Sequence, residues 1–238
     1  FTDESKGVWA TEDGLTSGGY LNVYLAWITL QAGGNYFDVG DEFRMALQYA
    51  YDLMYTHKAL NPASLQKDFD QQNADYQADR VAFMRQWPYF YGLTRAATEW
   101  YAEGKAEIAL PPVGPAGISG ATYAAGWGWV IPKTTGMSDE AQELVKFMVE
   151  KDNAVKMAEY DDWYLNARYS ILDAVGDREG IPAALKMYSE AGAIGTRPFH
   201  ERYSEAYTIL EESASAYLTK QISLDEAINQ AKSRMGRL

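Results

Sequence analysis

The chain has 238 residues, of which 47% are hydrophobic and 23% charged, a composition typical of a soluble globular protein with one large or two small domains. Its net charge of −12 argues against nucleic acid or an anionic membrane as a partner, because both bind basic surfaces. With 0 cysteines and only 2 histidines, the sequence excludes a disulfide framework, a thiolate nucleophile and a histidine-rich metal site, so we expect no cofactor.

Short strands alternate with helices in the first part of the chain. Apolar residues at positions 8–10 indicate a strand. A second apolar run begins at Val81 and must end near Trp87, because Pro88 lacks an N–H group and disfavours helix at the residue before it. Between the two strands, apolar residues recur at helical spacing or follow acidic residues that favour a helix start. We expect helices over residues 20–32, 41–58 and 68–78.

Three aromatic rings, Trp87, Tyr89 and Tyr91, follow the strand that begins at Val81. An aromatic cluster at such a corner can stack on the apolar face of a flat ligand such as a sugar ring, and tyrosine adds a hydroxyl group for hydrogen bonding. The same rings can instead pack a helix onto a sheet, because aromatic residues are mostly buried. The stretch by itself therefore leaves a binding role and a structural role open.

The remainder of the chain continues the α/β pattern, which is our predicted fold class. The triplet Gly126–Trp127–Gly128 lies inside a predicted strand and marks a kink or a close backbone approach. Ser138 is expected to cap one helix, and Ser223 with Glu226 forms a capping box for the last helix. We expect helices over residues 92–104, 139–150, 153–160, 182–191, 203–219 and 224–235, strands over 106–110 and 121–131, and irregular segments over 113–120, 161–170 and 192–198.

One carboxylate pair, Asp161–Asp162, raises the possibility of a carbohydrate-active enzyme. A glycosidase needs two carboxylates about 5–10 Å apart across the scissile bond, whereas adjacent residues usually point apart. A solvated helix end explains this pair better, so we expect no catalytic residue and no enzyme.

An ordered series of motifs resembles the extracellular solute-binding proteins of ABC sugar importers, the group that includes the maltose- and trehalose-binding proteins. The matching blocks are residues 30–38 (LQAGGNYFD), 73–91 (ending RQWPYFY), 110–115 (LPPVGP) followed by 126–127, 164–168 (YLNAR), and 197–198 with 203–205. The resemblance covers essentially the whole chain. The chain departs from the family pattern at Asp79, where glycine is frequent, and at Asn166–Ala167, which replace Pro-Thr.

The resemblance implies a periplasmic-binding-protein-like type II fold with two α/β lobes, of which this sequence is similar to the C-terminal two-thirds. Residues 1–126 would form the first part of the C-terminal lobe, 127–167 would cross to the N-terminal lobe, and 168–238 would supply closing helices of the C-terminal lobe. The remaining N-terminal lobe would be absent or present as a second chain. The apolar stripe of the helix near residues 138–150 would then need a cover from outside the chain.

The resemblance also implies the ligand site. Trp87, Tyr89, Trp127 and Tyr207 are the candidate rings for stacking on a pyranose, and Arg168 and Arg197 are candidates for forked hydrogen bonds to adjacent hydroxyl groups. Asn22 on the first helix is a further candidate. Each of these residues can also be structural.

The predicted function is an extracytoplasmic receptor, in the periplasm or at the cell surface, that captures a mono- or oligosaccharide between two lobes and delivers it to the permease subunits of an ABC transporter. Membrane association would occur through the permease or a lipid anchor. Two alternatives stay open, a carbohydrate-active enzyme and a receptor for a non-sugar solute such as a polyol or a sugar acid.

Overall fold

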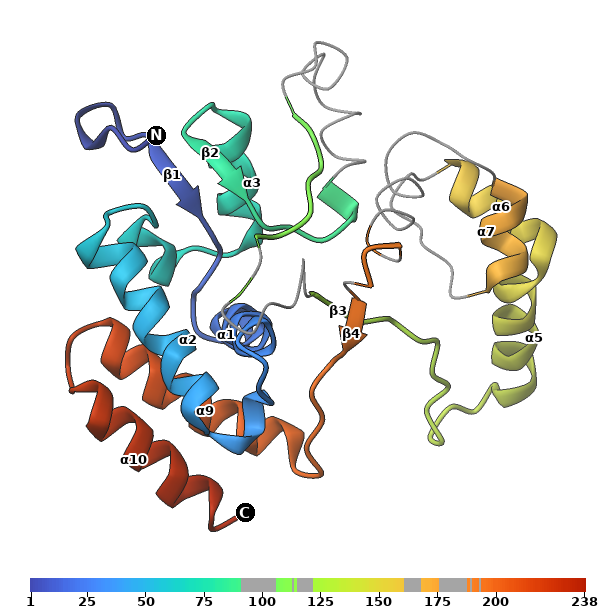
Figure 1. Cartoon of the computed structure of the whole chain (residues 1–238). Coiled ribbons are helices and arrows are strands. Elements are labelled where there is room, and N and C mark those ends of the chain that lie inside the picture. Colours follow the sequence, from blue (N-terminus) through green and yellow to red (C-terminus); the bar gives the residue numbers. More distant parts are fainter. Residues whose placement is uncertain are drawn as a thin grey trace. The chain divides into compact units, whose positions relative to one another are not determined.

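A computed structural model describes residues 1–90, 106–112, 114, 122–160, 168–175, 188, 190–192 and 194–238 of the chain (Figure 1). The chain divides into two compact units, each assembled from separate stretches of sequence. The larger unit contains Phe1–Gln86, Pro111–Ala124 and Ala191–Leu238, and the smaller unit contains Trp87–Leu110 and Ala125–Glu190. In the described residues, no helix is long and apolar enough to cross a membrane.

Four helices form the core of the larger unit: α1 (Tyr20–Gln31), α2 (Asp41–Tyr51), α9 (Tyr203–Leu218) and α10 (Leu224–Met235). Helix α1 packs against both α2 and α9, and α9 packs against α10 (Figure 1). Leu25, Leu47 and Leu210 from three of these helices are completely buried. Because α1 buries residues on most of its circumference, it is a central helix rather than a surface helix.

The predicted starts and ends of the helices in the larger unit are largely confirmed. Asp68 caps α3 (Phe69–Gln77) through a capping box with Gln71, and Ser223 caps α10 in the same way with Glu226. The predicted helix over residues 41–58 is α2 followed by a π-helical turn, Asp52–Thr56. Short 3-10 helices occupy Glu4–Lys6, Tyr36–Asp38 and Pro62–Gln66.

The described strands form two parallel pairs in the larger unit. Strand β1 (Trp9–Glu12) pairs with β2 (Val81–Met84), as the apolar runs at positions 8–10 and 81 onwards predict. Strand β3 (Thr122–Ala124) pairs with β4 (Ile194–Thr196). Parallel strands present their carboxyl ends at the same edge, so the residues that follow β1 and β2 lie close together, as do those that follow β3 and β4.

Three predictions about strands were wrong, wholly or in part. The loop predicted over 192–198 contains β4, which pairs with a strand about seventy residues earlier, a long-range contact that local sequence does not reveal. The strand predicted over 121–131 is limited to β3, because the following residues have no partner strand within the described part. The strand predicted over 106–110 is absent from those described residues.

Gly114 shows why the proline- and glycine-rich segment after residue 110 needs a glycine. A Cβ atom added to Gly114 would lie 2.2 Å from the backbone oxygen of Gln31 at the end of α1. The Gln31 side chain also donates a 3.3 Å hydrogen bond to the Pro112 carbonyl. The segment is therefore fixed against α1 by a contact that only glycine permits.

Three described helices belong to the smaller unit: α5 (Ser138–Val149), α6 (Lys151–Tyr160) and α7 (Tyr169–Val175), with α5 against α6 and α6 against α7. Helix α7 begins inside the segment predicted to be irregular, and Ser138 is the first residue of α5 rather than its cap. The predicted helices over 92–104 and most of 182–191, most of the predicted loop over 113–120, and Asp161–Asp162 lie outside the described residues.

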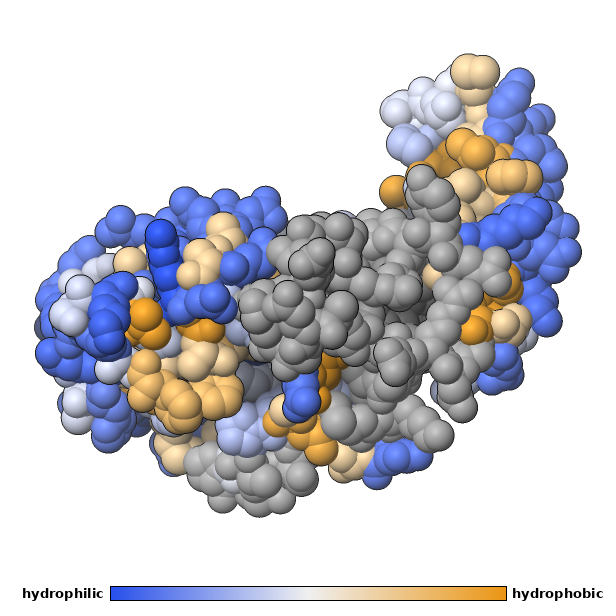
Figure 2. All heavy atoms as spheres, turned by 90° about the horizontal axis from the view of Figure 1, so that it is seen from above, coloured by the Kyte–Doolittle hydropathy of each residue, from blue (hydrophilic) through white to orange (hydrophobic). Residues whose placement is uncertain are grey.

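Helix α5 leaves its apolar stripe uncovered, as the sequence predicts. No residue of α5 is buried, and Leu144 and Phe147 are 61% and 59% exposed. Val145 and Met148 are only half-buried. Figure 2 shows hydrophobic side chains among hydrophilic ones on the visible face of the group formed by α5 to α7.

Candidate ligand-binding site

The polar residues of the larger unit concentrate where its strands end. Asp13 directly follows β1, Arg85 directly follows β2, and Arg197 directly follows β4. In open α/β sheets, ligands bind outside the carboxyl ends of the strands. The carboxyl ends of these two strand pairs are therefore where a binding site is expected in the larger unit.

Arg197 lies in a cluster of tyrosines contributed by α9. Its guanidinium group donates a long hydrogen bond of 3.4 Å from Nη2 to the hydroxyl of Tyr207, and its Cζ lies 5.5 Å from the centre of the Tyr203 ring. The Tyr203 and Tyr207 rings are stacked with their centres 4.4 Å apart. Two sequence-predicted residues, Arg197 and Tyr207, are thus brought into direct contact.

Two buried polar atoms of this cluster have no hydrogen-bond partner, Nε of Arg197 and the hydroxyl of Tyr203. Buried polar groups in native proteins are nearly always paired, so each exception calls for an explanation. The cluster can therefore offer a ligand further hydrogen-bond capacity beyond the single long bond to Tyr207.

Asn22 has a partner within the protein. Its buried amide oxygen accepts a short hydrogen bond from the hydroxyl of Tyr36, whose ring contacts the Tyr207 ring at 5.9 Å between centres. Tyr123 on β3 donates a 3.2 Å hydrogen bond to the Val23 carbonyl of α1. Asn22 therefore supports the tyrosine cluster through Tyr36. Its predicted ligand contact stays a prediction.

Tyr36, Tyr123 and Tyr203 are held in their protonated form. Burial raises the pKa of Tyr123 to about 12, and burial also raises the pKa of Tyr36 well above its ordinary value. Burial also raises the pKa of Tyr203, and the neighbouring Tyr207 adds to this rise. Their hydroxyl groups thus stay neutral hydrogen-bond donors across the physiological pH range.

Asp13 and Arg85 form a second polar group, at the carboxyl ends of β1 and β2, which the sequence analysis missed. The Asp13 carboxylate accepts two hydrogen bonds, 2.9 Å from Nε and 2.8 Å from Nη2 of Arg85. The Arg85 guanidinium also lies 5.4 Å from the Trp27 ring and 5.9 Å from the Tyr24 ring, as cation–π contacts require. Burial raises the pKa of Asp13 to about 6, and the attraction to Arg85 only partly opposes this rise.

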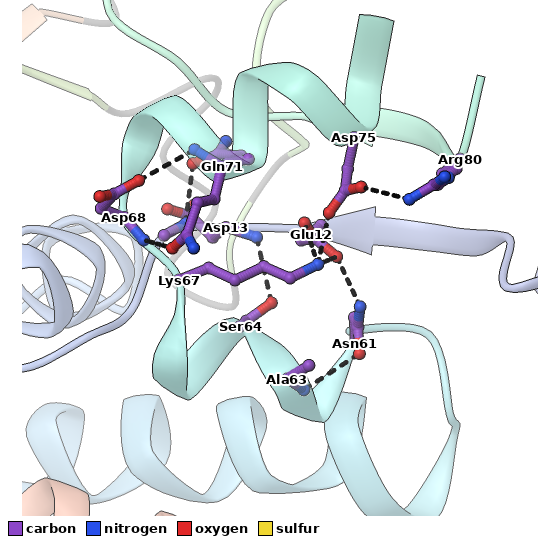
Figure 3. Close-up of polar contacts among 12 residues, drawn as sticks. Glu12, Asp13, Asn61, Ala63, Ser64, Lys67, Asp68, Gln71, Asp75 and Arg80 are labelled. Carbon is purple, nitrogen blue, oxygen red and sulfur yellow. Dashed lines mark hydrogen bonds and ion pairs between the residues drawn. The ribbon is translucent and has the colours of Figure 1, made fainter. Parts of the chain in front are cut away.

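An ion network that includes the buried Glu12 fixes the segment around β1, and Figure 3 shows its contacts. The Lys67 ammonium group donates 2.9 Å hydrogen bonds to both carboxylate oxygens of Glu12 and also contacts Asp75 on α3. Asn61 donates a 2.6 Å hydrogen bond to Glu12. Burial raises the pKa of Glu12 despite these contacts. The residues of this network form hydrogen bonds with one another. The network therefore fixes the strand and does not face a ligand.

The N-terminus of α1 is fixed to α9 near the tyrosine cluster. The backbone N–H groups of Gly18 and Gly19 donate hydrogen bonds of 3.0 and 2.9 Å to the two carboxylate oxygens of Glu211, one helical turn after Tyr207. Both glycines have positive φ angles, 108° and 109°, which other residues rarely adopt. A carboxylate at a helix N-terminus is also favoured by the helix dipole.

The other predicted site residues belong to the smaller unit. Trp87 and Tyr89 are half-buried, and Trp127 is fully exposed, at 104% of its reference area. Arg168 is exposed and donates a 2.6 Å hydrogen bond to the Val149 carbonyl at the end of α5. Their predicted role as ligand contacts, together with Arg197 and Tyr207, stays a prediction.

Comparison with known proteins identifies one matching family. The sequence model of the bacterial extracellular solute-binding proteins matches residues 5–155. The match includes the segments that form β1, β2 and β3 and the helices α1, α2, α3 and α5.

Solved structures of solute-binding proteins resemble the chain over nearly its whole length. Maltose-bound MalE3 of T. maritima has a TM-score of 0.84 and 23% sequence identity, over 99% of this chain and 62% of its own. A Thermotoga lettingae protein bound to α-D-tagatose has a TM-score of 0.85 and 20% identity, over 99% and 61%. An Agrobacterium radiobacter protein in complex with ribitol has a TM-score of 0.79 and 19% sequence identity, over 99% of this chain and 61% of its own. The fold is therefore that of the two-lobed solute-binding proteins, and the chain spans about 62% of the length of MalE3.

Proposed function

The chain belongs to the family of bacterial extracellular solute-binding proteins, and on that premise we propose that it forms most of a receptor for a mono- or oligosaccharide. The receptor would act outside the cytoplasm and deliver its ligand to the permease of an ABC transporter. The family match over residues 5–155 carries this proposal. Sugars or polyols bound to proteins of the same fold, namely maltose, tagatose and ribitol, support it.

The chemistry of the tyrosine cluster agrees with a carbohydrate ligand. A sugar ring presents C–H faces that stack on aromatic rings and hydroxyl edges that need polar partners. Tyr203 and Tyr207 supply rings and hydroxyl groups together, and Arg197 supplies hydrogen-bond donors with a fixed geometry. We assign Arg197 and Tyr207 to ligand contact on this basis.

Trp87, Tyr89, Trp127 and Arg168 are proposed as further ligand contacts through the resemblance that first singled them out. Trp127 supports this proposal best, because its complete exposure between two glycines gives the ring no packing role. In the proposed mechanism, two lobes close around the ligand by a hinge motion and exclude water from it. An exposed indole would then gain an apolar partner when the ligand binds.

The exposed face of α5 points to a further partner. Soluble proteins rarely leave a contiguous apolar helix face uncovered. The solved relatives are longer than this chain, which spans about 62% of MalE3. We propose that Leu144 and Phe147 pack against the remainder of the two-lobed fold, present in the same polypeptide or in a second chain.

Tryptophan fluorescence of the intact protein, titrated with a panel of mono- and oligosaccharides and polyols, tests the proposed function. A saturable change with at least one carbohydrate is the expected result. No response to any of them, with tight binding of a peptide or a metal ion instead, would reject it. The alternative of a carbohydrate-active enzyme predicts turnover of aryl glycosides that is lost in Asp161→Ala or Asp162→Ala, whereas the receptor predicts no turnover.

A further inference from the structure

Arg197 is the one half-buried arginine of the described larger unit that has no carboxylate partner. The other arginines of that unit pair with acidic side chains, except for Arg237, which is exposed and contacts Ser233. The pairs are Arg44–Asp225, Arg80–Asp75, Arg85–Asp13, Arg202–Glu205 and Arg234–Glu212. The chain has 33 carboxylate residues. The guanidinium group at the candidate site nevertheless has no carboxylate among the described residues to compensate its charge.

The protein also satisfies the hydrogen-bonding capacity of this guanidinium group poorly. Nη2 has the single long bond to Tyr207, and the buried Nε has no partner. Leaving a partly buried charge without a counter-charge costs free energy. A ligand that supplies the counter-charge can recover this free energy. A neutral hydroxyl group would satisfy a donor but would leave the charge uncompensated.

The side chains around Arg197 provide donors rather than anionic acceptors. The hydroxyl of Tyr207 accepts from Arg197, so its proton is available to a ligand, and the hydroxyl of Tyr203 has no partner. The two carboxylates that α9 carries next to Tyr203 and Tyr207 are already engaged, Glu205 by Arg202 and Glu211 by two backbone N–H groups. A cation flanked by hydroxyl donors matches an anionic ligand group better than a neutral one.

We propose that the ligand is a sugar acid, whose carboxylate binds the Arg197 guanidinium group while its ring lies against the tyrosine cluster. The proposal rests on the carbohydrate-receptor function proposed above and narrows its ligand class. A carboxylate matches the forked geometry of arginine with two parallel hydrogen bonds and supplies the missing negative charge. Because the whole chain carries a charge of −12, only a local unpaired cation can attract such a ligand.

Isothermal titration calorimetry of the intact protein tests this inference with matched pairs of ligands. Glucuronate and galacturonate are compared with glucose and galactose, and digalacturonate with galactobiose, at low and high salt. The wild-type protein is expected to bind at least one acid about tenfold or more tighter than its neutral counterpart, with a preference that weakens at high salt. Arg197→Gln should remove the preference, and Arg197→Lys should keep part of it because it retains the charge without the fork.

Arg202→Gln is the matched control, because Arg202 lies in the same segment, is exposed and is already paired with Glu205. It should leave the preference unchanged. If Arg197→Gln does not fold, the wild-type comparison and Arg197→Lys decide the question. Neutral sugars that bind as tightly as the acids, or binding of neutral sugars alone, would overturn the inference and leave the receptor function intact. Binding of no sugar, acid or polyol by the folded protein would remove both.

Discussion

Asp13 and Arg85 join the carboxyl ends of β1 and β2 through two parallel hydrogen bonds of 2.9 and 2.8 Å, although 72 positions separate them in the sequence. The Asp13 side chain is 3% exposed and that of Arg85 is 18% exposed. Nearly complete burial of the carboxylate makes it dependent on its partner. The pair therefore fixes the edge of the sheet next to the candidate site.

Removing the arginine of this pair should destabilise the protein strongly. Arg85→Ala leaves a buried carboxylate without compensation and is expected to cost about 3–5 kcal/mol of unfolding free energy at pH 7. Urea denaturation measures this change. Arg44→Ala is the control, because its pair with Asp225 is exposed and should contribute about 1 kcal/mol or less. Equal costs for the two variants would contradict the assignment.

The buried Asp13 should also give stability a distinct pH dependence. Its pKa is about 6 in the folded protein and close to its ordinary value, about 3.9, in the unfolded chain. Because the folded state holds the proton more tightly, the contribution of this group is present below about pH 4 and is lost as the pH rises through about 6. The loss amounts to about 3 kcal/mol.

Urea denaturation from pH 4 to pH 7 tests this dependence in the wild type and in Asp13→Asn, which cannot titrate at that position. The difference in unfolding free energy between the two proteins should shift across the window in favour of the variant as the pH rises. Parallel profiles would show that Asp13 ionises normally in the folded protein.

Glu211 should stabilise the start of α1 by accepting hydrogen bonds from Gly18 and Gly19. Glu211→Ala leaves both donors unpaired and is expected to lower the unfolding free energy by about 1–3 kcal/mol. Glu211→Gln keeps one acceptor and should lose less. Glu212→Ala, an exposed neighbour paired with Arg234, serves as the control in the same denaturation experiment. A cost for the control as large as that for Glu211→Ala would exclude a specific role.

Trp127 should affect binding without affecting stability. Because its ring is fully exposed, Trp127→Ala is expected to change the unfolding free energy by about 0.5 kcal/mol or less. Loss of a stacking ring should weaken carbohydrate binding by about 1–3 kcal/mol, roughly 5- to 150-fold in affinity. Tyr169→Ala removes another exposed ring of the smaller unit and should leave binding unchanged. A Trp127→Ala protein with parental affinity would argue against the assignment.

Local sequence signals were sufficient for much of the helical framework. The capping boxes at Asp68 and Ser223 specify helix starts through contacts three residues apart, so no distant partner is needed. Strand β4 could not be predicted in this way, because it is three residues long and exists through its pairing with β3. Helix α7 was not predicted either, because it has only seven residues and depends on packing against α6.

The candidate site was predictable only in part. Arg197 and Tyr207 were singled out through the family resemblance, and the structure brings them into contact. The pairing of Asp13 with Arg85 was missed because it joins two distant strand ends, although a charged residue directly after each strand was a signal that could have been used. Whether Arg197 has a carboxylate partner depends on which residues the tertiary fold brings next to it. Local sequence therefore could not predict that it has none in the described part of the chain.

The most direct measurement is a crystal structure of the intact protein with its bound ligand. The account predicts a carbohydrate in contact with Arg197 and Tyr207, with the ligand supplying hydrogen bonds to the guanidinium group. A ligand bound elsewhere, with the Arg197 cluster unchanged and without contact to it, would contradict the account.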